Sequence, residues 1–337
     1  MIGKIDFILL SFVLLNCASW ERVTSPQRWG WIGSANYKST QTFVIDPKQD
    51  SQIEAEEGTQ IQFPSGSLIG TDGSLITSPV RIEISEYYKG GDILLSGLST
   101  ASAGKPIQTK GMVFLNAYSE SGTKAQVNPK NPPKISFASP IEQGYEVFYG
   151  VKTSDGNLDW STETSKQKSI SNHGNVSFLP SLAKNQAATK STNMRYMIGM
   201  EGGPESVRNN VKPPAVFLPL LSLGWINCDR FLYMGIKLIP LNVEAPYPVL
   251  EEETWYYLIL PSIRSVMPAY SDANKRVSFP NLPPNEKAIL YGLRKSGATR
   301  WQLWIREVKI GQEEKLIPEW ELVGPKALEK RVQSLAF

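Results

Sequence analysis

The chain has 337 residues, of which 41% are hydrophobic and 20% are charged, so it is long enough to bury the cores of two domains. Its 35 basic and 32 acidic residues leave a net charge of only +3 and form no basic stripe, so nucleic acid is not an expected partner. The 26 glycines and 24 prolines, together with 13 tyrosines and 9 tryptophans, favour a protein rich in turns and β-strands.

Residues 1–16 have the pattern of an export signal. Lys4 precedes an apolar run from Phe7 to Leu15 that is interrupted only by Ser11. The run is too short to cross a bilayer, which takes about 20 apolar residues in a helix, but it has the length of the apolar part of a signal peptide. We therefore predict a signal peptide over these residues.

Cys17 follows the run, and Leu14-Leu15-Asn16-Cys17 resembles the lipobox of bacterial lipoproteins, although Asn16 departs from the usual Gly, Ala or Ser. Such relaxed boxes resemble those of spirochaetes and some Bacteroidota. The resemblance implies cleavage before Cys17 and attachment of acyl chains such as palmitate. Two or three chains anchor a protein firmly, because each buried CH₂ contributes about 0.8 kcal/mol. We expect a lipid-anchored envelope protein, on the periplasmic or surface face of the outer membrane.

Three other roles for this segment stay open. An ordinary signal peptide would be cut near Cys17-Ala18-Ser19, although a clean A-x-A site is absent. A disulfide between Cys17 and Cys228, the only other cysteine, suits an oxidising compartment but needs no apolar run before it. A core strand at the N-terminus would not need Lys4 followed at once by such a run.

Residues 17–42 are expected to form a tether, and residues 43–160 a first β-sandwich with a following hairpin. Apolar and polar side chains alternate around Ile61–Phe63 and through Val80–Ile84, which is the period of a half-buried strand. Turn residues separate these runs, and no convincing amphipathic helix lies between them. Short strands at this spacing predict a β-sandwich.

The segment from Ile61 to Gly122 resembles a module of envelope proteins from Bacteroidota and Leptospira, and through it the ZU5 β-sandwich of ankyrin-type and netrin-receptor proteins. The matching pieces are Phe63–Leu68, which contains Pro64 and Gly66, and then Glu86–Tyr88, Asp92–Gly97 and Thr109–Met112. The resemblance is confined to the first module and implies protein–protein contact. The autoproteolytic His-Phe-Ser element of some ZU5 proteins is absent, so self-cleavage is not expected.

Two acidic residues of this module, Glu86 and Asp92, are candidates for a carboxylate pair. We interpret them instead as capping groups of the turns between strands. The segment Gly91–Thr100 is expected to be a crossover loop whose leucines close the end of the sandwich.

Residues 161–212 are the most polar stretch and predict an exposed linker between the two modules. It contains His173, the only histidine of the chain. A histidine-based zinc site, or a Ser-His-Asp or Cys-His catalytic group, would have to use His173, and we expect neither. We predict no metal, cofactor or catalytic residue.

Residues 213–315 are expected to form a second β-sandwich. It opens with a string that resembles a signature of the same envelope proteins, composed of Gly224, Trp225, Ile226, Asn227, Cys228, Asp229, Arg230 and Phe231. We expect Asp229 and Arg230 to form an ion pair. Cys228 lacks a nearby base and has apolar neighbours, so we interpret it as a small buried hydrophobic residue rather than a nucleophile.

Arg300, Trp301, Trp304 and Arg306 are the candidate binding residues, because together they offer an aromatic platform with charged neighbours. Aromatic residues that alternate along a strand more often belong to a core. Solvent-facing tryptophans beside two close carboxylates would favour a glycan-binding protein or a carboxylate-based hydrolase. Tryptophans buried between sheets would favour a non-catalytic protein.

The tail, residues 316–337, is predicted to end in a short helix on which Leu328, Val332 and Leu335 form one stripe. The sequence thus predicts an all-β protein with two β-sandwich modules. Its expected function is non-catalytic, in binding, adhesion or envelope assembly, with a protein or glycan as partner or as a subunit of a larger envelope complex.

Overall fold

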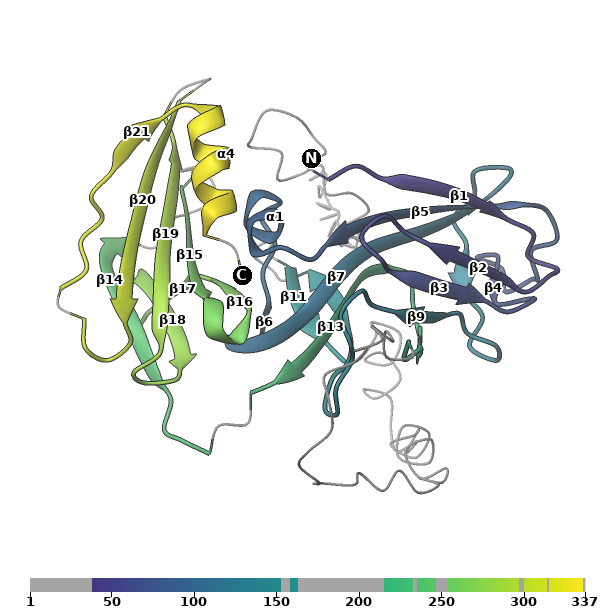
Figure 1. Cartoon of the computed structure of the whole chain (residues 1–337), viewed down its shortest axis with the longest axis horizontal. Coiled ribbons are helices and arrows are strands. Elements are labelled where there is room, and N and C mark those ends of the chain that lie inside the picture. The colour runs from purple at the N-terminus through teal and green to yellow at the C-terminus, as the bar shows by residue number, and fades with distance from the viewer. Residues whose placement is uncertain are drawn as a thin grey trace, which may run out of the picture.

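The computed structural model describes residues 38–152, 158–162, 215–232, 235–246, 254–296, 300–313, 315–335 and 337. Within these ranges the chain is mostly strands with two short α-helices, which confirms the all-β prediction. The strands form two bodies that lie side by side (Figure 1). The first body holds the described residues up to 232, and the second body holds those from 235 onward. None of the described helices is both long and apolar enough to span a membrane.

The first body is built on a large antiparallel sheet with the order β1-β5-β7-β13-β10-β11, and β6 pairs with β7. Its strands are β1 (Gln41–Ile45), β5 (Val80–Tyr87), β6 (Ala101–Ser102), β7 (Lys105–Ser119), β10 (Glu146–Lys152), β11 (Leu158–Ser161) and β13 (Gly224–Phe231). A smaller sheet has the order β12-β9-β3-β2. Its strands are β2 (Ser51–Glu54), β3 (Gln60–Phe63), β9 (Lys134–Ser136) and β12 (Leu218–Pro219), and β4 (Leu68–Ile69) pairs separately with β8 (Gln126–Val127).

The two sheets of the first body contribute to one hydrophobic core. Val80, Ile82 and Ile84 of β5 are fully buried and belong to the same cluster as Ile61 and Phe63 of β3. The predicted alternation of these two strands is therefore confirmed, because the side chains at every second position of a strand share one face.

The position of β13 corrects the predicted domain boundary. This strand carries the signature string, and it pairs with β7 on one side and β10 on the other, inside the first body rather than at the opening of the second. The polar stretch 161–212 lies almost entirely outside the described residues. The chain enters it after β11 of the first body and leaves it before β12 of the same body, so it does not separate the two bodies. The chain passes from the first body to the second in the short connection between β13 and β14.

The second body consists of two further antiparallel sheets, in the orders β16-β15-β19-β20-β21 and β14-β18-β17. Their strands are β14 (Ile239–Pro246), β15 (Thr254–Leu260), β16 (Ser265–Pro268), β17 (Tyr270–Ser271), β18 (Arg276–Leu282), β19 (Lys287–Lys295), β20 (Trp301–Lys309) and β21 (Glu321–Val323), with a 3-10 turn η3 (Pro261–Ile263) after β15. Leu258 of β15, Leu290 of β19 and Phe279 of β18 are completely buried in one cluster, so both sheets bury a common core.

Two helices lie where the bodies meet (Figure 1). α1 (Gly90–Leu95) replaces the loop expected there, although its leucines are buried as predicted. α4 (Pro325–Ser334) is the predicted C-terminal helix and buries Leu328 and Val332. A Cβ atom on Gly91 would lie 3.0 Å from Cα of Gln333, so glycine is what allows α1 to approach α4 this closely.

A third hydrophobic cluster spans the boundary between the bodies. It joins Leu94 of α1 and Trp225 of β13 to Tyr291 of β19, Leu303 of β20 and Val332 of α4. Interfaces between independent domains are usually more polar than this. The two bodies are therefore packed as one unit through a shared apolar core.

Candidate functional site

The predicted aromatic platform is not formed. Trp301 and Trp304 are only 4% and 3% exposed. The ring of Trp301 lies 6.4 Å from that of Trp255, and the ring of Trp304 meets Tyr256 edge-on at 6.4 Å. Both tryptophans are thus core residues, and of the four candidate residues only the arginines at 300 and 306 reach solvent.

The central residues of the signature strand β13 are buried and pack against apolar and aromatic side chains. Cys228 is fully buried and not in a disulfide, and burial raises the pKa of its thiol far above the ordinary value, as expected for a small hydrophobic residue. Trp225 packs against the rings of Tyr87 and Phe114 at 5.4 and 4.8 Å. Gly224, at the start of the strand, has a φ of +112°, which favours glycine.

The expected ion pair between Asp229 and Arg230 is wrong. Consecutive side chains of a strand point to opposite faces, so the two groups diverge. Asp229 is fully buried, and its Oδ2 accepts a hydrogen bond of 2.6 Å from Nδ2 of Asn227, whose Oδ1 accepts one of 2.9 Å from Thr109. The Oδ1 atom of Asp229 has no hydrogen-bond partner among the described residues, and burial raises the pKa of this carboxyl well above its ordinary value.

Pro64 and Gly66 form the turn that the sequence indicated. The N–H of Ser67 donates to the carbonyl oxygen of Pro64 at 2.9 Å, and Gly66 has a φ of +70°. Glycine at the third position of such a turn is the requirement of type II geometry. The turn ends β3, and its Ser65 hydroxyl donates to the carbonyl oxygen of Lys48 at 2.8 Å.

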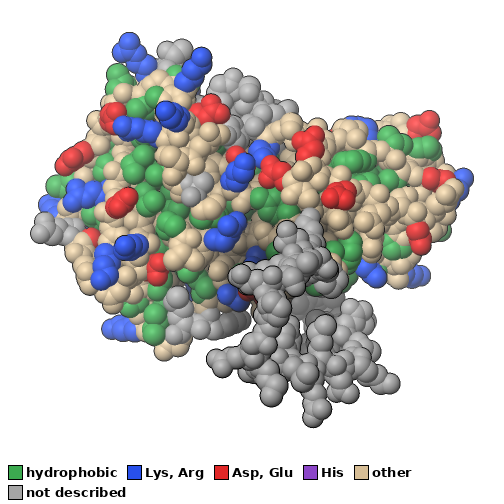
Figure 2. All heavy atoms as spheres, in the orientation of Figure 1, with side chains coloured by type: hydrophobic (Ala, Val, Ile, Leu, Met, Phe, Trp, Pro, Cys, Tyr) green, Lys and Arg blue, Asp and Glu red, His purple; other side chains and the backbone are tan. Residues whose placement is uncertain are grey.

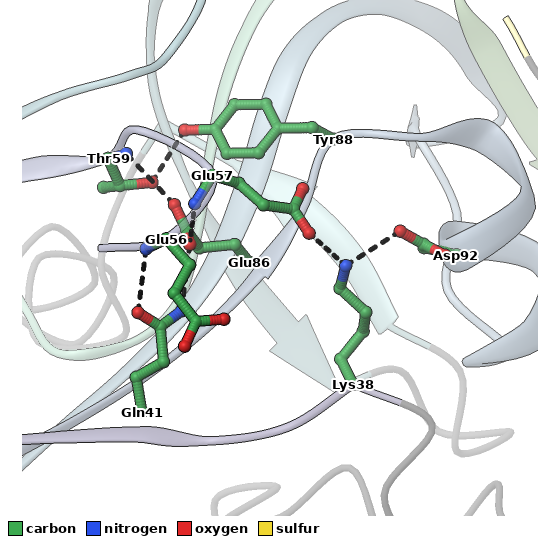
Figure 3. Close-up of polar contacts among 8 residues, drawn as sticks. All are labelled: Lys38, Gln41, Glu56, Glu57, Thr59, Glu86, Tyr88 and Asp92. Carbon is green, nitrogen blue, oxygen red and sulfur yellow. Dashed lines mark hydrogen bonds and ion pairs between the residues drawn. The ribbon is translucent and has the colours of Figure 1, made fainter.

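A group of polar side chains that includes four carboxylates lies in the first body, near where the described chain begins (Figure 3). We define it as the junction cluster, made of Lys38, Gln41, Glu56, Glu57, Thr59, Glu86, Tyr88 and Asp92. Lys38 donates to Oδ2 of Asp92 at 3.0 Å and also pairs with Glu57. Burial by itself would lower the pKa of Lys38. The hydrogen bonds to Glu57 and Asp92 outweigh this effect and raise the pKa above its ordinary value.

Glu86 is the centre of the junction cluster and is only 1% exposed. Its carboxylate accepts hydrogen bonds from Nε2 of Gln41 at 3.0 Å, from the N–H of Glu57 at 2.7 Å and from the N–H of Thr59 at 3.0 Å. Glu86 therefore caps the turn between β2 and β3, as the sequence indicated. Asp92 instead lies in the first turn of α1 and holds Lys38, so the two carboxylates have separate structural partners.

A second polar group is more open to solvent and contains two cations. We define it as the Tyr145 cluster, made of Gln108, Lys110, Glu142, Tyr145 and Arg230. Nζ of Lys110 lies 4.9 Å and Cζ of Arg230 lies 4.8 Å from the centre of the Tyr145 ring, within the range of cation–π contacts. Lys110 also donates to Oε1 of Glu142 at 2.8 Å.

Local backbone features produce the Tyr145 cluster. The pairing of β7 with β13 is irregular between Cys228 and Asp229, and Lys110 is the extra residue on the β7 side. The segment from Glu142 to Tyr145 is a turn in which the N–H of Tyr145 lies 3.4 Å from the carbonyl oxygen of Glu142 and Gly144 has a φ of +91°. The bulge and the turn together bring a carboxylate and an aromatic ring to two strand-borne cations.

The sequence analysis did not find this cluster. Its residues come from β7, β13 and the loop before β10, and only the glycine at 144 gives a local turn signal. Charges of both signs are interspersed over the face shown in Figure 2, without a large patch of one sign. No group of three or more potential metal ligands occurs among the described residues.

Comparisons of the chain with known protein families, with curated proteins and with solved structures give no match.

Proposed function

We propose that this chain is a lipid-anchored protein of the cell envelope, at the outer membrane, and that it acts by binding rather than by catalysis. The anchor rests on the sequence pattern at Phe7–Leu15 and Cys17, which lie outside the described residues. The resemblance of Ile61–Gly122 to contact modules of the ZU5 type supports a protein as partner.

The observation that carries the binding function is the burial of Trp301 and Trp304. A glycan hydrolase needs an accessible sugar platform beside its carboxylates, and these rings are core residues. The carboxylates of the junction cluster are likewise used to hold the β2–β3 turn and Lys38. The Tyr145 cluster places two partly exposed cations beside one carboxylate, an arrangement suited to binding an anion.

The arrangement of the chain fits presentation of a rigid body on a tether. Lys38, the first described residue, is fixed to α1 at the boundary between the two bodies. The chain between Cys17 and Lys38 can reach at most about 70 Å when fully extended. Acyl chains on Cys17 would therefore hold the packed unit close to the membrane.

The anchor is tested by the substitution Cys17→Ala. We expect the wild-type protein to enter the detergent phase and to carry labelled palmitate, and the variant to lose both properties. Cys228→Ala is the matched control and should retain them. Unchanged partitioning of the Cys17→Ala protein would end the proposal. Pull-down from envelope extracts, followed by mass spectrometry, then identifies the partner.

A further inference from the structure

We propose that the Tyr145 cluster is a carboxylate-binding site for an acidic side chain or chain terminus of a partner protein, and that Glu142 is its resident occupant. This inference rests on the proposed binding function and assigns it to a place on the first body. Three features carry it: fixed cations, an exposed internal carboxylate and unused hydrogen-bond donors.

The cations are held in place by the large sheet. Arg230 and Gln108 are paired residues of β13 and β7, and Nε of Arg230 donates to Oε1 of Gln108 at 2.7 Å. The side chains of Lys110 and Arg230 are 17% and 35% exposed, so both are largely packed but still reach solvent. Binding an anion there requires little further ordering of the two side chains.

Glu142 shows what kind of group the cations accept. Its Oε1 receives the hydrogen bond from Lys110, and its Oε2 lies 3.8 Å from Nη1 of Arg230. The hydrogen bond from Lys110 and its charge lower the pKa of Glu142 below the ordinary value. The carboxylate is 59% exposed and is carried by a turn rather than a strand, so it can be displaced at little cost.

The cluster has capacity for an external anion. Glu142 supplies one negative charge against two positive charges. The 3.8 Å separation from Arg230 is too long for a hydrogen bond, so within the described part of the chain Nε is the only guanidinium nitrogen with a hydrogen-bond acceptor. A guanidinium offers a planar fork that fits a carboxylate with two parallel hydrogen bonds. An incoming carboxylate can use this fork while it replaces Glu142 on Lys110.

The surroundings favour a protein carboxylate over a sugar acid. Tyr145 is only 8% exposed and its ring already contacts both cations, so it offers no open face on which a sugar ring could stack. A carboxylate at the end of a flexible side chain needs only the two charged ends.

Fluorescence anisotropy with a labelled polyglutamate peptide tests the site, using full-length protein in detergent micelles at low ionic strength. We expect Glu142→Gln to raise the affinity about twofold to fivefold, because it removes the internal competitor. Adding Lys110→Gln or Arg230→Gln to that variant should lower the affinity at least about tenfold. Lys134→Gln, which removes an exposed charge from β9, is the matched control and should change little.

Several outcomes would overturn the proposal. One is an unchanged affinity in Glu142→Gln, and another is an equal effect of Lys110→Gln and Lys134→Gln in variants with the same melting temperature. Free glucuronate that displaces the peptide at lower concentration than free glutamate would identify a sugar-acid site instead. A wild-type protein that carries no palmitate but still binds the peptide would defeat the anchor but not the site. Normal labelling without peptide binding would do the reverse.

Discussion

Two buried carboxylates of the first body, Glu86 and Asp229, differ in how completely their oxygens are hydrogen-bonded. Glu86 lies at the edge of the body and accepts three hydrogen bonds, two of them from backbone N–H groups. Asp229 lies at the irregular pairing of β7 and β13, accepts one hydrogen bond from Asn227 and has one oxygen without a partner. A buried carboxylate that accepts a full set of hydrogen bonds stabilises the fold. A buried carboxylate that lacks them destabilises the folded state when it is ionised, and protonation removes that destabilisation.

The largest effect is expected at Glu86. We expect Glu86→Ala to lower the free energy of unfolding by about 3 kcal/mol, because the partly buried N–H of Glu57 and the buried N–H of Thr59 would lose their acceptor. Urea denaturation measures the change. Glu83→Ala, on the same strand but with a more exposed carboxylate, is the control and should lower the free energy of unfolding by less than about 1 kcal/mol. Equal losses in both variants would show that the donors to Glu86 do not set its contribution.

A gain is expected at Asp229. The pKa of Asp229 in the folded protein is raised well above the ordinary value of 3.8, so the folded state holds a proton that the unfolded state has lost. The contribution of this group to stability is therefore greatest at low pH and falls as the pH rises above that value. Asp229→Asn keeps the shape without the charge, and we expect it to raise the free energy of unfolding by about 1–3 kcal/mol near pH 8.

The pH dependence distinguishes this explanation from a packing effect. The difference between Asp229→Asn and the wild type should shrink toward zero as the pH is lowered below about 3, because the carboxyl is then neutral in the unfolded state as well as in the folded state. Urea denaturation of both proteins at several pH values measures the difference between their free energies of unfolding. All other titrating groups are present in both proteins, so their effects cancel in this difference. A gain that is the same at every pH would contradict the role of ionisation.

The contrast between these two acids also shows what could be predicted from the sequence. Alternation along Val80–Ile84 predicted a half-buried strand, and the stripe through Leu328 and Val332 predicted α4, because both patterns are local. A capping role for Glu86 was also predicted, but the turn that it caps was not, because Glu57 and Thr59 lie 29 and 27 residues away from it in the chain. The surroundings of Asp229 did not, because β13 pairs with β7 across more than a hundred residues of chain.

Other parts of the structure escaped prediction for related reasons. α1 has only six residues and begins with two glycines, so no helical period is visible in it, and its stability comes from packing against α4. The Tyr145 cluster depends on a β-bulge at Lys110 and on the pairing of β13 with two other strands. Neither feature is encoded by residue spacing, since a bulge is defined by the partner strand.

The smallest effect on stability is expected at Tyr291 of the second body. This residue extends the comparison of buried groups with and without hydrogen-bond partners to an uncharged side chain. Tyr291 is fully buried, and its hydroxyl has no hydrogen-bond partner among the described residues. Tyr291→Phe removes that hydroxyl and keeps the ring beside Tyr257, so we expect a gain of up to about 1 kcal/mol in the free energy of unfolding, independent of pH between about 4 and 8. The hydroxyl oxygen of Tyr149 accepts a hydrogen bond of 2.7 Å from the N–H of Leu221, so Tyr149→Phe should instead destabilise the protein. Thermal denaturation of both variants checks the pair: a loss of stability in Tyr291→Phe as large as that in Tyr149→Phe would mean that hydrogen bonding does not separate the two tyrosines.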